Sequence, residues 1–420
     1  MLRVHPVRND KEENMEIGSM RGTPFHSSTA ARTNSTWWYS WGGYVVPDVY
    51  TDLYTELGAI RNGAAMNEMS PIPKTEIKGP DSRLFVDYLF PRDISKMRVG
   101  NAWYAPCCTD DGMVVADGIV FRFDEDRFVF AADNCTKHFM ERAGLFDVSV
   151  NNVTDDYGIL ALQGPRSMEV LGEATGEDWS DLEFARIRTT TIAGACVNVA
   201  RQGFTGELGF ELWVDRPDGQ DVWESVASAG ASVGVQPAGE YAIDVARVEA
   251  GLLLISAEYS GASTEEPSSD VPPNPVDHAT PYELNLGHCI KLGKESDFIG
   301  RAALAGDLAT GPSRRLTGLE FDAPHIVRRA LNEGRSPDLS PRVRWDHLPL
   351  RHNGELVGRA SSVTWSPTTS RLIGFGMLPT ELANPGTELT VDWADFWGCA
   401  LGSAPVTTCE YPFIELGSRP

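Results

Sequence analysis

The chain has no long apolar run and comparatively little positive charge. No stretch reaches the roughly 18 consecutive apolar residues that a membrane-spanning helix requires, which excludes a transmembrane segment. Lys and Arg number 36 against 59 Asp and Glu, so the net charge is −23. Such a surface repels polyanions, and we therefore expect neither nucleic acid nor an anionic membrane as a partner. A small-molecule substrate in a pocket with local positive charge is compatible with this composition.

The cysteine and histidine patterns that hold metals are also missing. The seven cysteines are scattered along the chain, and no CxxC pair, zinc-ribbon spacing or HExxH motif occurs. The sequence therefore predicts free thiols in a reducing compartment and no metal centre. Residues 1–30 carry several charges and lack an apolar core of the secretory type, so we expect a cytoplasmic protein.

Motifs for nucleotide binding and covalent catalysis do not fit their surroundings. No GxGxxG opens a helix after a strand, and Gly293-Lys294 lacks the rest of a phosphate-binding loop. Residues 230–234 match GxSxG, but they end a helical stretch, whereas a nucleophile elbow needs a strand before the serine. The sequence thus favours chemistry that needs no protein nucleophile, metal or nucleotide.

Composition divides the chain into a leader, a mixed region and a β-rich end. Residues 1–30 are polar and aperiodic, which predicts a disordered leader. Residues 260–276 hold four prolines with many Ser and acidic residues, so we expect a surface loop there. Beyond residue 280, apolar alternation interrupted by turns predicts a separate all-β domain.

Several short motifs follow one another over most of the chain. They are Ile77–Asp81, Gly100–Tyr104, Asp111–Gly118, Leu160–Pro165, Gly203–Glu211 and Ala238–Leu252. In their order and spacing they resemble the glycine-cleavage T-protein (aminomethyltransferase) superfamily of folate-dependent one-carbon transferases. Residues 282–287 and 297–301 resemble the link into the third domain of that family.

The resemblance implies an α+β fold arranged as a three-domain ring. The second domain would be ferredoxin-like and the C-terminal domain β-barrel-like, and tetrahydrofolate would be the co-substrate that accepts the one-carbon group. The expected boundaries are 31–70, 132–156 and 235–284 for the folate-binding first domain, 71–131 and 157–234 for the second, and 285–420 for the C-terminal β domain.

Two acidic residues are the first candidates for holding the folate. Asp117 matches the family aspartate near the reacting nitrogen, where it would position N5 and stabilise charge. Gly118 beside it lacks a side chain and would let a ligand approach the backbone. Glu211 matches the family residue that reads the pterin edge, because a carboxylate accepts two adjacent N–H bonds. Glu207 and Tyr104 are further folate-binding candidates, with a solvated turn and ordinary core as their respective alternatives.

A predicted helix near residues 240–250 carries three more candidates. Arg247 can pair bidentately with a carboxyl group and would bind the folate tail. Glu249, only two residues on, faces elsewhere and is expected to make a structural ion pair. Tyr241 has a phenol that could donate a proton to a departing phenolate, so it is either the general acid or a packing residue.

Departures from the glycine-cleavage pattern indicate a branch of the superfamily. The glycine-cleavage enzyme usually shows two adjacent aspartates where this chain has Ala116-Asp117, and it lacks a long acidic insertion such as residues 255–279. In these respects the chain resembles tetrahydrofolate-dependent O-demethylases of the vanillate, syringate and dicamba type. The resemblance implies methyl transfer from a small methoxylated, aromatic carboxylic acid to N5, which yields 5-methyltetrahydrofolate.

Such a substrate calls for a cation and an aromatic wall. Arg122 is the candidate cation, although it has the opposite strand parity to Asp117 and would face the other way unless a bulge intervenes. Trp37 and Trp41 either wall an aromatic substrate pocket or belong to ordinary core.

Other functions stay open. S- or N-demethylation of an osmolyte, such as dimethylsulfoniopropionate or a methylated glycine, would need cation–π contact with tryptophan and no acid. A glycine-cleavage-type aminomethyltransferase and a non-catalytic folate-binding protein are compatible with the same residues.

Overall fold

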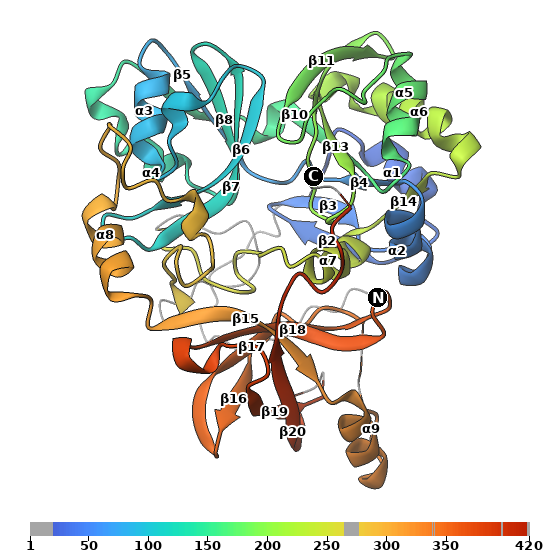
Figure 1. Cartoon of the computed structure of the whole chain (residues 1–420). Helices are drawn as coiled ribbons and strands as arrows, with labels where there is room; N and C mark the ends of the chain where they lie inside the picture. The colour runs from blue at the N-terminus through green and yellow to red at the C-terminus, as the bar shows by residue number, and fades with distance from the viewer. Residues whose placement is uncertain (1–19, 264–276, 338, 340, 396–397, 418–420) are drawn as a thin grey trace, which may run out of the picture.

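The computed structural model describes residues 20–263, 277–337, 339, 341–395 and 398–417, and these residues form three lobes (Figure 1). Two lobes are each built on an open sheet, and the third is a closed β-barrel. The expected α+β class with a C-terminal barrel is confirmed. In the part of the chain that is described, no helix is both long enough and apolar enough to cross a membrane.

The first lobe is built on a six-stranded sheet with the order β11-β12-β13-β10-β4-β14, which we call the first sheet. Its strands are β4 (Ala65–Glu68), β10 (Tyr157–Gln163), β11 (Ile187–Ile192), β12 (Ala195–Ala200), β13 (Gly209–Asp215) and β14 (Gln236–Pro237). On its outer face, Phe210 and Leu212 share an apolar core with Leu171 of α5 (Ser167–Thr175) and Trp223 of α6 (Gly219–Ala229). The lobe also contains α1 (His26–Arg32), α2 (Leu53–Asn62), α7 (Glu240–Glu249) and a small sheet of β1 (Arg21–Gly22), β3 (Tyr44–Pro47) and β2 (Trp38–Trp41).

The second lobe contains a five-stranded sheet with the order β6-β7-β8-β5-β9, which we call the second sheet. Its elements are β5 (Lys74–Lys78), α3 (Ser82–Leu89), β6 (Asn101–Cys108), β7 (Val114–Asp124), β8 (Arg127–Ala131), α4 (Thr136–Met140) and β9 (Ser149–Asn152). One face of this sheet packs on α3 and α4 through residues such as Phe85, Phe130 and Phe139.

The two sheets pack face to face across a shared apolar interface. Phe121 of the second sheet contacts Trp213 of the first, with 4.5 Å between ring centroids. Ile159 and Ala161 of β10 belong to the same cluster of buried side chains. Because side chains alternate along a strand, this interface identifies which residues of β7 and β13 face the opposite lobe.

The third lobe is the barrel, in which β15 pairs with both β18 and β20 and so closes the sheet. Its strands are β15 (Arg314–Phe321), β16 (Leu348–His352), β17 (Glu355–Ser366), β18 (Arg371–Pro379), β19 (Glu388–Ala394) and β20 (Ala400–Cys409). Helix α8 (Arg301–Thr310) precedes the barrel, and α9 (Ala323–Asn332) lies between its first two strands in sequence. Apolar residues of α2, α7 and the barrel form one core at the junction of the lobes.

Strand pairing corrects the expected domain boundaries. The predicted first domain includes 132–156, but β9 in that range pairs with β5 of the second sheet. The predicted second domain includes 157–234, but β10 pairs with β4 and β13 in the first sheet. Alternating apolar residues identify a strand without naming its partner, which is why the boundaries were wrong.

The expected disordered leader is also partly wrong. Residues 21–32 contain β1 and α1, and Phe25 is fully buried against Trp223. The aromatic ring is buried in the core, so this part of the leader is anchored. Residues 1–19, and 264–276 of the predicted surface loop, lie outside the described residues.

Candidate active site

Asp117 lies on β7, on the face of the second sheet that meets the first sheet. Ile119 and Phe121 share this face and belong to the apolar interface between the sheets. The Asp117 carboxylate accepts hydrogen bonds from the hydroxyl groups of Tyr104, at 2.6 Å, and of Tyr259. Tyr104 comes from the neighbouring strand β6, whereas Tyr259 lies in the segment after α7. Asp117 is thus held by side chains from two distant parts of the chain.

Burial controls the ionisation of this cluster. It raises the pKa of Asp117 above the ordinary value, and the two hydroxyl bonds oppose that rise. Burial, together with the nearby carboxylate, raises the pKa of Tyr104 and of Tyr259 well above normal. Both phenols therefore stay protonated at neutral pH and donate to the carboxylate, which favours its ionised form. A carboxylate held in this way can stabilise positive charge that develops on a bound ligand.

Gly118 does not open the space that the sequence predicts. A Cβ at this position would lie 2.2 Å from the carbonyl oxygen of Ala131 and 2.6 Å from the Cβ of Ala132. Glycine is needed here because β8 passes very close to β7. The prediction of a ligand at the Gly118 backbone is therefore wrong.

Glu211 lies on β13 and faces the second sheet. Trp213, two residues further along, shares its face and contacts Phe121. The Gln202 amide nitrogen Nε2 donates to Oε2 of Glu211 at 2.8 Å. Burial raises the pKa of Glu211, while the hydrogen bond from Gln202 and the charge of Lys74 lower it. Asp117 and Glu211 therefore lie on the facing surfaces of two packed sheets.

Gln202 is a residue that sequence reasoning missed. Its side chain is buried, and its Oε1 makes no hydrogen bond within the described part of the chain. This amide oxygen and the Glu211 carboxylate together form an acceptor set, which fits the N–H groups along one edge of a pterin. The available signal was its position directly before the glycine-rich turn that begins at Gly203.

Asn67 adds a polar group to the same face of the first sheet, and Glu240, the first residue of α7, lies beside it. Asn67 is paired with Ala161, which is paired in turn with Glu211, so Asn67 and Glu211 are two strand spacings, or about 10 Å, apart. The Asn67 amide donates to the carbonyl oxygen of Ala238 at 3.0 Å and to Oε1 of Glu240 at 3.3 Å. Burial raises the pKa of Glu240 to about 8. The carboxyl group of Glu240, beside Asn67, is therefore mostly protonated at neutral pH.

Glu207 belongs to a different ion-pair cluster. Arg61 of α2 binds Glu207 at 3.0 Å and Glu249 of α7 at 2.8 Å. Ser366, the last residue of β17, and Thr368 just after it donate to Glu249 at 2.6 and 2.9 Å. The structural ion pair expected for Glu249 is confirmed. A folate contact of Glu207 stays a prediction.

Arg247 of α7 makes its contacts within the protein. Its side chain is fully buried and pairs with Glu258 at 2.9 Å and with Asp244 at 2.8 Å. A third contact reaches the Ser362 hydroxyl of the barrel at 2.7 Å. Protein acceptors from three segments thus surround the guanidinium, and the tail-binding role of Arg247 stays a prediction.

Tyr241 lies where the first lobe meets the barrel lobe. It is the second residue of α7, and the Arg342 guanidinium lies 4.2 Å from its ring centroid. Arg342 precedes β16 and also makes an ion pair with Asp48. Tyr241 and Tyr104 pack against the same apolar core at the lobe junction. The general-acid role of Tyr241 stays a prediction.

The predicted substrate subsite is not assembled. Arg122 lies on the opposite face of β7, where it donates to the Met97 carbonyl oxygen and binds Glu125 at 2.7 Å. The irregularities in β7 lie before Asp117 and after Arg122, so neither turns Arg122 toward the first lobe. Trp41 packs in the interface between the sheets, and Trp37 is 58% exposed. Arg122 and the two tryptophans therefore do not line a common pocket.

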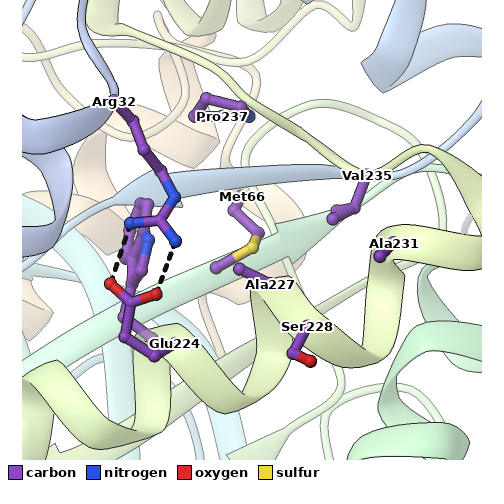
Figure 2. Close-up of a pocket in the computed structure, with 9 residues that line it drawn as sticks. Arg32, Met66, Glu224, Ala227, Ser228, Ala231, Val235 and Pro237 are labelled. Atoms are coloured by element: carbon purple, nitrogen blue, oxygen red, sulfur yellow. Dashed lines mark hydrogen bonds and ion pairs between the residues drawn. The ribbon is translucent and has the colours of Figure 1, made fainter.

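A pocket opens on the outer face of the first sheet, against α6 (Figure 2). Arg32 and Glu224 at its edge bind each other through two hydrogen bonds of 2.8 and 2.5 Å. Met66 and Trp223 line it from the core on the side away from Glu211. Since its charged groups satisfy each other and the sheet separates it from Glu211, it is not part of the Asp117–Glu211 site.

Comparisons with known proteins find the same family, the glycine-cleavage T-proteins, along most of the chain. The model of the GCVT N-terminal domain matches residues 28–266, and that of the glycine cleavage T-protein C-terminal barrel domain matches residues 336–413. The aminomethyltransferase of Saccharopolyspora erythraea is 31% identical over 404 residues, which cover 95% of this chain and 99% of that protein. The aminomethyltransferase of Alkaliphilus metalliredigens is 32% identical over 356 residues, with coverage of 83% and 88%. The crystal structure of glycine cleavage system aminomethyltransferase T from Bartonella henselae has a similar fold, with a TM-score of 0.78 at 22% identity and coverage of 96% and 100%.

Proposed function

The chain belongs to the glycine-cleavage T-protein superfamily, and from this premise we propose that it transfers a one-carbon group to tetrahydrofolate. The observation that carries the proposal is the pair of carboxylates, Asp117 and Glu211, on the facing surfaces of two packed sheets. Each is held by protein donors, so their positions are set before any ligand binds.

Each group of the site has a distinct task in this reaction. Glu211 and Gln202 would accept the N–H groups of the pterin edge and so orient the ring. Tetrahydrofolate supplies the nucleophilic nitrogen. Asp117 would stabilise the positive charge that this nitrogen acquires on taking the carbon, and Tyr104 and Tyr259 would keep Asp117 ionised and correctly placed.

The proposed donor is an aminomethyl group. Support comes from relatives named aminomethyltransferase that match this chain over nearly its full length. The second candidate is O-demethylation of a methyl ether, which the phenol of Tyr241 and the Ala116-Asp117 sequence favour. An aromatic acid as the ether has less support, because Arg122, Trp37 and Trp41 do not come together.

The products separate these candidates. Purified protein is incubated with tetrahydrofolate and either an aminomethyl thioether or a panel of methyl ethers that includes methoxybenzoates. Mass spectrometry of the folates then reports 5,10-methylenetetrahydrofolate for aminomethyl transfer and 5-methyltetrahydrofolate for demethylation. Tetrahydrofolate binding without either product would leave a non-catalytic folate-binding protein. If tetrahydrofolate does not quench tryptophan fluorescence and no product forms, the proposal is refuted.

A further inference from the structure

Lys74 is a buried cation to which the reaction described above assigns no task. It is the first residue of β5, and its side chain has no exposed surface. Its ammonium donates to the carbonyl oxygens of Ser70 at 2.7 Å and Ile72 at 2.9 Å. Lysine is rarely buried to this extent without a charged partner, so its surroundings should show what it balances.

The ammonium of Lys74 lies in the interface between the two sheets, and its charge acts on Glu211. It is 5.8 Å from the ring centroid of Trp213. Trp213 and Glu211 share one face of β13 and are two residues apart, which corresponds to about 7 Å along a strand. Glu68 of β4 is the other charged group that acts on Lys74, and its carboxylate accepts from Thr23 at 2.6 Å.

Recognition of a pterin edge needs an ionised Glu211, because only the carboxylate accepts two N–H bonds side by side. Burial works against that ionised form. Lys74 directs two of its N–H bonds to backbone carbonyl groups, so it acts on Glu211 through its charge rather than through a hydrogen bond. We propose that Lys74 is a positioning residue whose buried ammonium keeps Glu211 ionised and thereby sets the acid limit of folate binding. This inference rests on the proposed function.

The direction of the effect follows from the two ionisations. The pKa of Lys74 is lowered to about 7 by burial, so the ammonium carries its charge below neutrality. The charge of Lys74 lowers the pKa of Glu211. Without it, Glu211 takes up its proton at higher pH. Folate affinity should then begin to fall at a higher pH than in the wild-type protein.

Lys74→Gln is the main test, because its amide can still donate to the Ser70 and Ile72 carbonyl groups. The dissociation constant of tetrahydrofolate is measured by tryptophan fluorescence between about pH 5 and pH 8. We expect the acid limb, the low-pH side of the curve of affinity against pH, to move up by about one pH unit. Affinity at a given pH on that limb then falls about tenfold. Lys74→Arg, which retains the charge, should leave the limb unchanged. An unchanged limb in Lys74→Gln, or an equal loss of affinity at every pH, would overturn the inference.

A second measurement separates this inference from the proposed function. ¹³C NMR of labelled glutamate carboxyl groups, with Glu211 assigned by comparison with Glu211→Gln, follows its titration without folate. Lys74→Gln should raise the pKa of Glu211 by about one unit even if tetrahydrofolate does not bind. Should Lys74→Gln fail to fold, the wild-type protein provides the test. Its acid limb of folate binding must coincide with the titration of Glu211, and a limb at another pH contradicts the inference.

Discussion

Asp117→Asn separates the charge of the site from its shape. The amide keeps the size of the side chain and one oxygen that can accept from Tyr104 or Tyr259. Burial raises the folded-state pKa of Asp117 above its unfolded value, so folding favours the protonated form. The wild-type protein therefore loses stability as the pH rises from the unfolded pKa through the folded one. At pH 7 the variant should be at least as stable as the wild type, with a weaker pH dependence above about pH 4.

The effect on catalysis should be much larger than the effect on stability. Removing one preorganised electrostatic group from a reacting centre typically lowers kcat by about 10²–10³, which corresponds to about 2.7–4 kcal/mol. The dissociation constant of tetrahydrofolate should rise by only about tenfold or less, because the charge matters most while the carbon is transferred.

The assay compares kcat, folate affinity and thermal unfolding at about pH 5 and pH 8. Asp126→Asn is the matched control, since Asp126 is exposed in the turn between β7 and β8 and should leave all three unchanged. Wild-type turnover in Asp117→Asn would refute the assignment of Asp117 to the reacting centre. Unfolding of the variant would instead make Asp117 a structural residue.

Three further substitutions test neighbouring parts of the argument. Tyr259→Phe removes one hydrogen-bond donor from Asp117, so kcat at neutral pH should fall about tenfold. The acid limb of the curve of kcat against pH should also move to higher pH. If that limb does not move, the role of the hydroxyl group is contradicted. Arg247→Met leaves Glu258 buried without its cation, and urea unfolding should show a loss of about 3–5 kcal/mol. A loss below about 1 kcal/mol would contradict this structural role. Tyr241→Phe should change the aminomethyl reaction little but lower methyl-ether turnover strongly, and equal kcat values with a methyl ether would exclude Tyr241 as the general acid.

Local sequence patterns predicted features that depend on nearby residues. Strand alternation placed Arg122 on the opposite face from Asp117, and the structure has it there. The position of Glu249 two residues after Arg247 predicted a different direction and a separate ion pair, which Arg61 provides. Turns and alternation beyond residue 280 predicted a β domain, and the barrel confirms it.

Only the tertiary structure decided which distant residues meet. Arg247 contacts Glu258 and also Ser362 of the barrel, which is 115 positions away from it in the sequence. No local sequence pattern predicts such a contact. Gln202 contacts Glu211 because the chain after β12 turns back beside β13, and Lys74 of the second lobe lies against Trp213 of the first. The sequence by itself therefore predicted the fold class, which the structure confirms, and the two carboxylates of the proposed site, because their signals lie within short segments. The hydrogen-bond donors and charged neighbours of these carboxylates depend on which sheets pack together. The two sheets pack because both of their apolar faces become buried at the same interface.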